Sequence, residues 1–193
     1  VTQMTLDEKL QLVHGALTTD WWAHPVPRGA GGVVPGIPRL GIPDLYLADG
    51  STGVGNSVGE ATALPSSIAS AATWDLASAY KYGQVIGTEM RALGINVNLG
   101  GNVNLTGREP RDGRTFETKG EDPILAGRIN AAHLKAIQDQ FVMAGIKHYA
   151  FNDVETGRTD IAERHDRRTH PQAHFLRDPG AHRGHFGPRP VDA

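Results

Sequence analysis

The sequence predicts an α/β fold with a parallel sheet, and two observations support this. Short apolar runs alternate along the chain with segments of helical periodicity that are about 10 to 18 residues long, the length of a crossover between parallel strands. A polar segment also lies at the end of each predicted strand, and parallel α/β folds build their sites at that end. We therefore expect helices packed on a parallel sheet, with any site at one end of the sheet.

The first half of the chain contains a helix, a long connection and a strand. Thr5 and Glu8 have the spacing of a capping box, which predicts a helix running to Val13. The Gly- and Pro-rich segment 24–43 predicts a long surface connection. The apolar run 45–48 follows and ends at Asp49-Gly50, which predicts a buried strand and then a loop.

The remaining elements follow in alternation. Helical periodicity predicts helices at 66–72 and 76–93, the second ending at Gly94. Pro123 suits the first turn of a further helix that runs to about residue 140. Strands are predicted at 95–99 and within 142–149.

The composition is that of a globular protein of one domain, or at most two small ones. The chain has 193 residues, 39% of them hydrophobic, and a formal net charge of −2, which offers no general attraction for nucleic acid or an anionic membrane. It has no cysteine, which excludes disulfides, thiolate zinc sites and cysteine nucleophiles. No stretch approaches the roughly 20 apolar residues of a membrane span. The sequence begins at Val1 and shows no signal peptide, so the compartment stays unknown, with a periplasmic or secreted location possible.

The sequence divides into a body, residues 1–158, and a tail, residues 159–193. The tail has five His, six Arg, four Pro and no Lys, and its few apolar residues follow no period. We expect it to be disordered. His170 and His174 are spaced i, i+4, but Pro171 and the lack of an apolar face make this a poor metal platform. We predict no metal site.

Polar clusters lie at or beyond the predicted strand ends. Asp49 can be a simple turn residue, residues 108–114 with Glu117 a surface ion-pair loop, and residues 121–122 the acidic start of a helix. Lys147 and His148 differ, because a cation and an imidazole in a buried strand are costly unless they have partners. A function is therefore expected at this pair.

A succession of motifs over residues 2–158 resembles one known family. The motifs include Leu47-Ala48-Asp49-Gly50, Arg114-Thr115-Phe116-Glu117, Gly120-Glu121-Asp122-Pro123 and Ile146-Lys147-His148-Tyr149. Their order and spacing are similar to the N-terminal domain of glycoside hydrolase family 3, of the β-glucosidase type.

The resemblance implies an incomplete (β/α)8, TIM-barrel-like domain and retaining hydrolysis of β-glucosides or related oligosaccharides, with no cofactor. With the charge and the apolar pattern described above, we expect neither a nucleic-acid nor a membrane partner. The family's substrate-binding residues map onto Asp49, Arg114, Lys147 and His148. Their carboxylate, guanidinium, ammonium and imidazole groups can bind adjacent sugar hydroxyls.

The sequence departs from the family in two places. Many members have Pro after the Asp-Gly pair and Arg near position 55, where this chain has Ser51 and Gly55. The family's nucleophile and acid/base also have no counterparts, and Asp153 and Glu155 match ordinary positions, so we assign no catalytic residue. The chain alone is then expected to be inactive. The alternatives are a non-catalytic carbohydrate-binding remnant and a nonfunctional truncated product. Residues 150–153 disfavour β-N-acetylglucosaminidase specificity.

The tail has the character of a frameshift product. Possible codons for residues 164–170, shifted by one base, encode Ala-Met-Ile-Asp-Glu-Arg-Thr. That reading resembles the continuation of family members beyond the Glu-Thr-Gly-Arg segment. We interpret 159–193 as a reading-frame change, and sequencing the gene tests this.

Overall fold

The computed structural model describes residues 1–14, 30–55, 60–106, 111–148, 152 and 155. The tail predicted at 159–193 lies outside these residues. The helices are α1 (Leu6–His14), α2 (Ser67–Ala71), α3 (Leu76–Ala92) and α4 (Pro123–Gln138), with the 3-10 turns η1 (Pro38–Leu40) and η2 (Thr115–Glu117). The strands are β1 (Gly32–Val34), β2 (Leu45–Ala48), β3 (Val97–Asn102) and β4 (Met143–Lys147).

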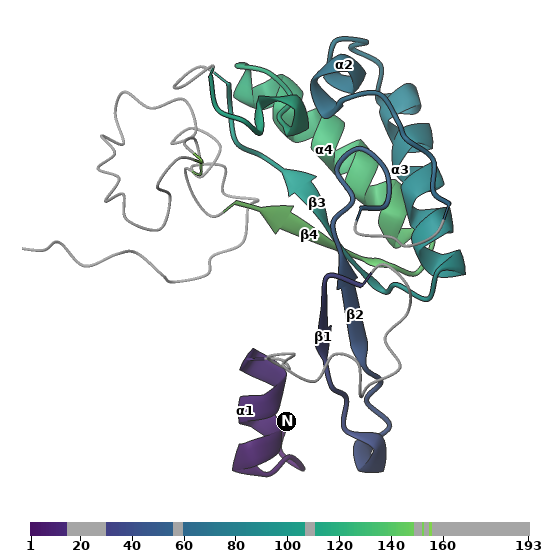
Figure 1. Ribbon diagram of the computed structural model, residues 1–193, viewed down its shortest axis with the longest axis vertical. Coiled ribbons are helices and arrows are strands. Elements are labelled where there is room, and N and C mark those ends of the chain that lie inside the picture. Colours follow the sequence, from purple (N-terminus) through teal and green to yellow (C-terminus); the bar gives the residue numbers. More distant parts are fainter. Residues whose placement is uncertain (15–29, 56–59, 107–110, 149–151, 153–154, 156–193) are drawn as a thin grey trace, which may run out of the picture.

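The strands form one sheet in the order β1-β2-β3-β4 (Figure 1). β2 pairs with β3 and β3 with β4 in parallel, and α3 and α4 are the principal helices of the two connections. The predicted α/β class and parallel sheet are confirmed. β1, antiparallel to β2, was missed, because three residues beginning with glycine inside a Gly/Pro-rich segment show no strand periodicity.

The predicted start signals stabilise the helices. The amide of Glu8 donates to Thr5 Oγ1, and Glu8 Oε2 accepts from the Thr5 amide, which completes the capping box of α1. Asp75 caps α3 by accepting from the Ala77 amide at 2.9 Å. Asp122 accepts from two amides of the first turn of α4, whose first residue is Pro123. The interpretation of residue 122 as a helix start is therefore confirmed.

α3 and α4 lie side by side and cover one face of the parallel strands (Figure 1). Gly83 allows this close contact, since a Cβ there would lie 2.1 Å from the carbonyl oxygen of His133. The main core lies between these helices and the sheet. Its buried members are Ala48, Val54, Tyr82, Ile86, Met90, Ile95, Leu134, Ile137 and Val142.

The two outer strands are less well covered than this centre. α1, which lies against β1, has no buried residue. On β4, the edge of the described sheet, Met143 is 49% exposed and Ile146 is 62% exposed. The strand at 142–149 was expected to be buried. No described strand pairs with its outer edge, and none of the five residues of β4 is fully buried, so the expectation of a buried strand was wrong.

Candidate functional site

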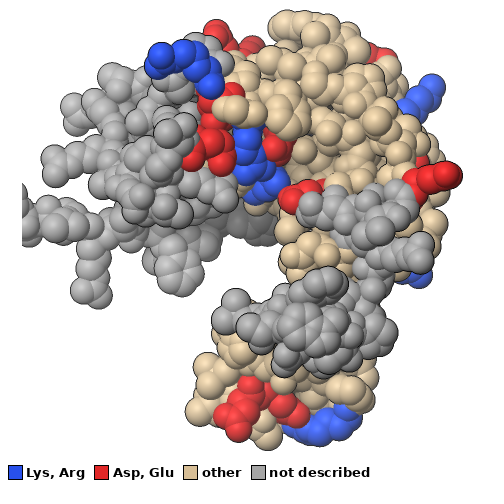
Figure 2. All heavy atoms as spheres, viewed as in Figure 1, with Lys and Arg blue, Asp and Glu red and all other residues tan. Residues whose placement is uncertain are grey.

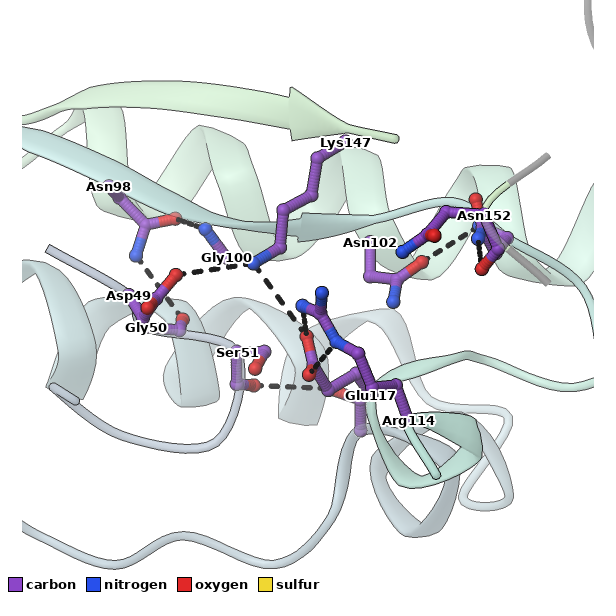
Figure 3. Close-up of polar contacts among 12 residues, drawn as sticks. Asp49, Gly50, Ser51, Asn98, Gly100, Asn102, Arg114, Glu117, Lys147 and Asn152 are labelled. Atoms are coloured by element: carbon purple, nitrogen blue, oxygen red, sulfur yellow. Dashed lines mark hydrogen bonds and ion pairs between the residues drawn. The ribbon is translucent and has the colours of Figure 1, made fainter. Parts of the chain in front are cut away.

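Charged side chains from three places in the sequence meet at the carboxyl ends of the parallel strands (Figure 3). Asp49 follows β2, Lys147 ends β4 and Arg114 immediately precedes η2. Lys147 Nζ lies 3.3 Å from Asp49 Oδ1 and 3.8 Å from Glu117 Oε2. The lysine side chain thus connects the end of β2 to the η2 turn.

Glu117 is the buried centre of this network, with 7% of its surface exposed. Arg114 Nε donates to Glu117 Oε1 at 2.7 Å and Arg114 Nη2 donates to Oε2 at 2.9 Å, the two-pronged geometry of a strong arginine–carboxylate pair. Burial alone would raise the pKa of Glu117. The bonds and charge of Arg114, the charge of Lys147 and a hydrogen bond with the Ser51 side chain outweigh burial and lower this pKa.

Arg114 also contacts a second carboxylate. Its Nη1 lies 3.4 Å from Glu155 Oε1, and that oxygen accepts from Asn152 Nδ2 at 2.9 Å. The pKa of Arg114 is raised, first by its hydrogen bonds to Glu117. The guanidinium is therefore a permanent cation held between two acidic side chains.

His148 lies beside this network. Burial, together with the positive charges of Arg114 and Lys147, lowers its pKa to about 4, against the opposing charges of Glu117 and Glu155. The ring is neutral at ordinary pH. Its Nδ1 is buried and has no hydrogen-bond partner within the described part of the chain.

Close packing against β3 fixes the loop that carries Asp49. Asn98 Nδ2 donates to the carbonyl of Gly50 at 3.2 Å, and the Asp49 carbonyl accepts from the Gly55 amide at 2.7 Å. A Cβ at Gly100 would lie 2.1 Å from the Gly50 carbonyl oxygen, so only glycine allows the strand and loop to approach this closely. Asp49 itself stays open, with 53% of its side chain exposed.

The four substrate-binding residues predicted from the sequence therefore lie at one end of the sheet. Asp49, Lys147 and Arg114 are joined through Glu117, and His148 feels the charge of both cations. The central role of Glu117 was missed, although its spacing of three residues from Arg114 was a usable signal. Residues 108 and 153, also considered from the sequence, lie outside the described residues.

This end of the sheet presents both hydrogen-bond acceptors and donors. Figure 2 shows acidic and basic side chains in contact with one another on the described surface. Such mixed groups can bind a polyhydroxylated molecule, since each hydroxyl both donates and accepts. Across the described ranges, no group of three His, Asp or Glu side chains could hold a metal ion. None of the described helices combines the length and the apolar character needed to cross a membrane.

The chain matches the family described as glycosyl hydrolase family 3 N-terminal domain over residues 36–173. A probable β-glucosidase A from Aspergillus terreus is 41% identical over 155 residues, which are 80% of this chain and 17% of that protein. β-Glucosidase 1 from Aspergillus aculeatus is 41% identical over 163 residues, 84% of this chain and 18% of that protein. The chain thus spans about a sixth of the length of these relatives.

Solved structures show the same likeness. DesR, a β-glucosidase from Streptomyces venezuelae in complex with D-glucose, has a TM-score of 0.72 and 44% identity, covering 81% of this chain and 19% of that one. β-Glucosidase 3B from Thermotoga neapolitana in complex with α-D-glucose has a TM-score of 0.72 and 35% identity, covering 80% and 23% of the two chains. These likenesses confirm the predicted fold, an α/β unit with part of a TIM-barrel-like sheet.

Proposed function

This chain belongs to glycosyl hydrolase family 3, and from that membership we propose that its described residues form the glucose-binding part of a β-glucosidase. The observation that carries the proposal is the network of Asp49, Lys147, Glu117 and Arg114 at the carboxyl ends of β2 and β4. Parallel α/β folds bind their substrates at this end of the sheet.

Each of the four residues has a distinct role in this proposal. The exposed carboxylate of Asp49 accepts from sugar hydroxyls, while the Lys147 ammonium and the Arg114 guanidinium donate to hydroxyl oxygens. His148 is neutral, and its half-buried ring offers a hydrogen-bonding group to a sugar hydroxyl. Such bonds hold the ring while it distorts toward the oxocarbenium-like transition state of glycoside hydrolysis.

The described site also suggests which step these residues do not perform. Retaining hydrolysis uses two carboxyl groups about 5–5.5 Å apart, one as nucleophile and one that cycles between acid and base. Glu117 is buried against two cations, and its lowered pKa makes it unsuitable as an acid. Glu155 is bound to Arg114 and Asn152. We therefore propose that the 193-residue chain binds glucose but does not hydrolyse β-glucosides by itself.

Glucose titration of the purified chain tests the binding, with calorimetry as the readout. We expect saturable binding, and Asp49→Asn should weaken it by about tenfold to a hundredfold, because hydrogen bonds to a charged group contribute about 1.5–3 kcal/mol. Asp139→Asn is the matched control, since Asp139 also pairs with a lysine, Lys135, but at the end of α4. Equal affinities of wild type and Asp49→Asn would contradict the assigned role.

An aryl β-glucoside assay on the same preparation tests the chemistry. We expect no turnover above a blank prepared from cells without the gene. Turnover at the rate of an ordinary enzyme would overturn the proposed division between binding and hydrolysis. Absence of both binding and turnover would instead favour a nonfunctional product.

A further inference from the structure

We infer that Glu117 is a positioning residue that holds Arg114 and Lys147 in the geometry that receives the sugar. This inference rests on the glucose-binding role proposed above. Glu117 contacts both cations, whereas Asp49 pairs with Lys147 and Glu155 pairs with Arg114.

The burial of Glu117 excludes direct contact with a ligand as its main role. Its side chain is 9% exposed, compared with 53% for Asp49. Glu117 Oε1 accepts a hydrogen bond from Arg114 Nε. Its Oε2 accepts one from Arg114 Nη2 and lies 3.8 Å from Lys147 Nζ. Both oxygens are thus in contact with the cations.

The η2 turn makes Glu117 a rigid support. The Thr118 hydroxyl donates to the Thr115 carbonyl at 2.8 Å, and the Thr115 hydroxyl donates to the Asp112 carbonyl at 2.7 Å. The Glu117 amide donates to the Arg114 carbonyl at 3.0 Å, which brings residues 114 and 117 to the same side of a single turn. The arginine and its carboxylate are therefore linked through both backbone and side chains.

The charge of Glu117 explains why two cations can face one sugar. Two neighbouring cations repel each other, and long side chains lose rotamer freedom when a ligand fixes them. An ionised carboxylate between them offsets the repulsion and fixes both side chains before the sugar arrives. The lowered pKa of Glu117 keeps this carboxylate charged at neutral pH.

The Glu117→Gln variant tests the inference, because it keeps the size of the side chain and removes its charge. We expect glucose affinity to fall by about tenfold to a hundredfold, the usual effect of displacing a ligand-binding group through its support. Glu89→Gln is the matched control. Glu89 is also a hydrogen-bonded carboxylate, which accepts from the amide and the hydroxyl of Thr62, but it lies on α3, outside the network of charged residues at the strand ends.

A spectroscopic measurement separates positioning from general stability. The side-chain Nε–H of Arg114, followed by ¹⁵N NMR relaxation in the full chain, should be rigid without glucose in wild type and mobile in Glu117→Gln. The backbone amides of α3 and α4 should be unchanged. A mobile Arg114 side chain in the wild-type chain would overturn the inference, even if the variant does not fold.

The combined outcomes distinguish the two proposals. If wild type does not bind glucose but Arg114 is rigid and depends on Glu117, the glucose-binding proposal fails and the positioning role stands. If wild type binds glucose and Glu117→Gln binds it within about twofold, the positioning role is wrong and glucose binding stands.

Discussion

Glu117 and Lys119 are two residues apart and almost equally buried, with 7% and 1% of their surfaces exposed, yet their surroundings differ sharply. Glu117 contacts Arg114 and Lys147 at the strand ends. Lys119 Nζ has no hydrogen-bond partner among the described residues. Within this short segment, Glu117 is therefore paired with opposite charges, whereas the Lys119 ammonium has no hydrogen-bond partner among the described residues.

A second buried base, His133 of α4, is affected by the charge of Lys119. Burial lowers the pKa of Lys119 to about 8, although the charge of Glu117 opposes this. Burial also lowers the pKa of His133 to about 3, and the positive charge of Lys119 adds to the effect. A buried group therefore stays charged where opposite charges surround it, and its pKa shifts to favour the neutral form where they are missing.

The largest expected effect is a loss of stability on acidification, which we attribute to buried His133. The folded pKa of His133, about 3, lies below the unfolded value of 6.5, so the unfolded chain binds the extra proton between these pH values. The stability contribution of neutral His133 is present above pH 6.5 and is lost as the pH falls toward 3. Its loss corresponds to roughly 5 kcal/mol.

Urea unfolding at several pH values measures this contribution. His133→Met should unfold with a shallower dependence on pH between 6.5 and 3 than wild type. Leu134→Met, which replaces a core side chain of α4 that does not titrate, is the control and should keep the wild-type slope. Identical slopes for His133→Met and wild type would show that His133 does not titrate as described.

Removing Arg114 should destabilise the protein, because buried Glu117 then loses the cation that binds it most closely. Arg114→Met leaves Glu117 buried with Lys147 Nζ, at 3.8 Å, as its ion-pair partner among the described residues, and breaking a buried pair in this way costs about 3–5 kcal/mol. Urea unfolding at pH 7 measures the loss. Arg39→Met is the matched control, because Arg39 grips Glu8 with the same two-pronged geometry at an exposed site. Equal losses in the two variants would contradict the importance of burial.

Replacing Lys119 should stabilise the protein. Lys119→Met removes the buried ammonium and keeps the apolar stem, so the free energy of unfolding should rise near pH 7, by up to about 3 kcal/mol. Between pH 8 and 10.5 the unfolded wild type binds more protons than the folded form, so wild-type stability rises with pH and the advantage of the variant shrinks. Thermal melts at pH 7 and pH 10 check both points. Lys135→Met, at an exposed ion pair, should give no such gain.

Much of the fold could be predicted because its signals are local. β2 has the predicted bounds, and α4 begins at Pro123 as expected. β3, predicted at 95–99, instead runs from Val97 to Asn102, because pairing of Gly101 and Asn102 with β4 extends it through glycines that have little strand tendency of their own. β1 likewise depends on its pairing with β2.

The candidate site, too, could be predicted from the sequence only in part. Asp49 and Lys147 could be placed because each stands at the end of an apolar run, and parallel pairing then brings such ends together. The buried carboxylate of Glu117 and the buried amine of Lys119 could not, because both lie in or just after one short turn, where no periodicity shows which side chains are covered. Their burial is set by packing from distant parts of the chain.

The order of the strands in the sheet follows their order along the chain. As the polypeptide leaves the ribosome, each new strand therefore finds its neighbour already synthesised, and none has to insert between two that are already paired. Domains generally fold as units from the N-terminus during synthesis, and contacts close in sequence form fastest. The described sheet can accordingly grow by addition at one edge, with Lys147 reaching Asp49 once β4 has paired with β3.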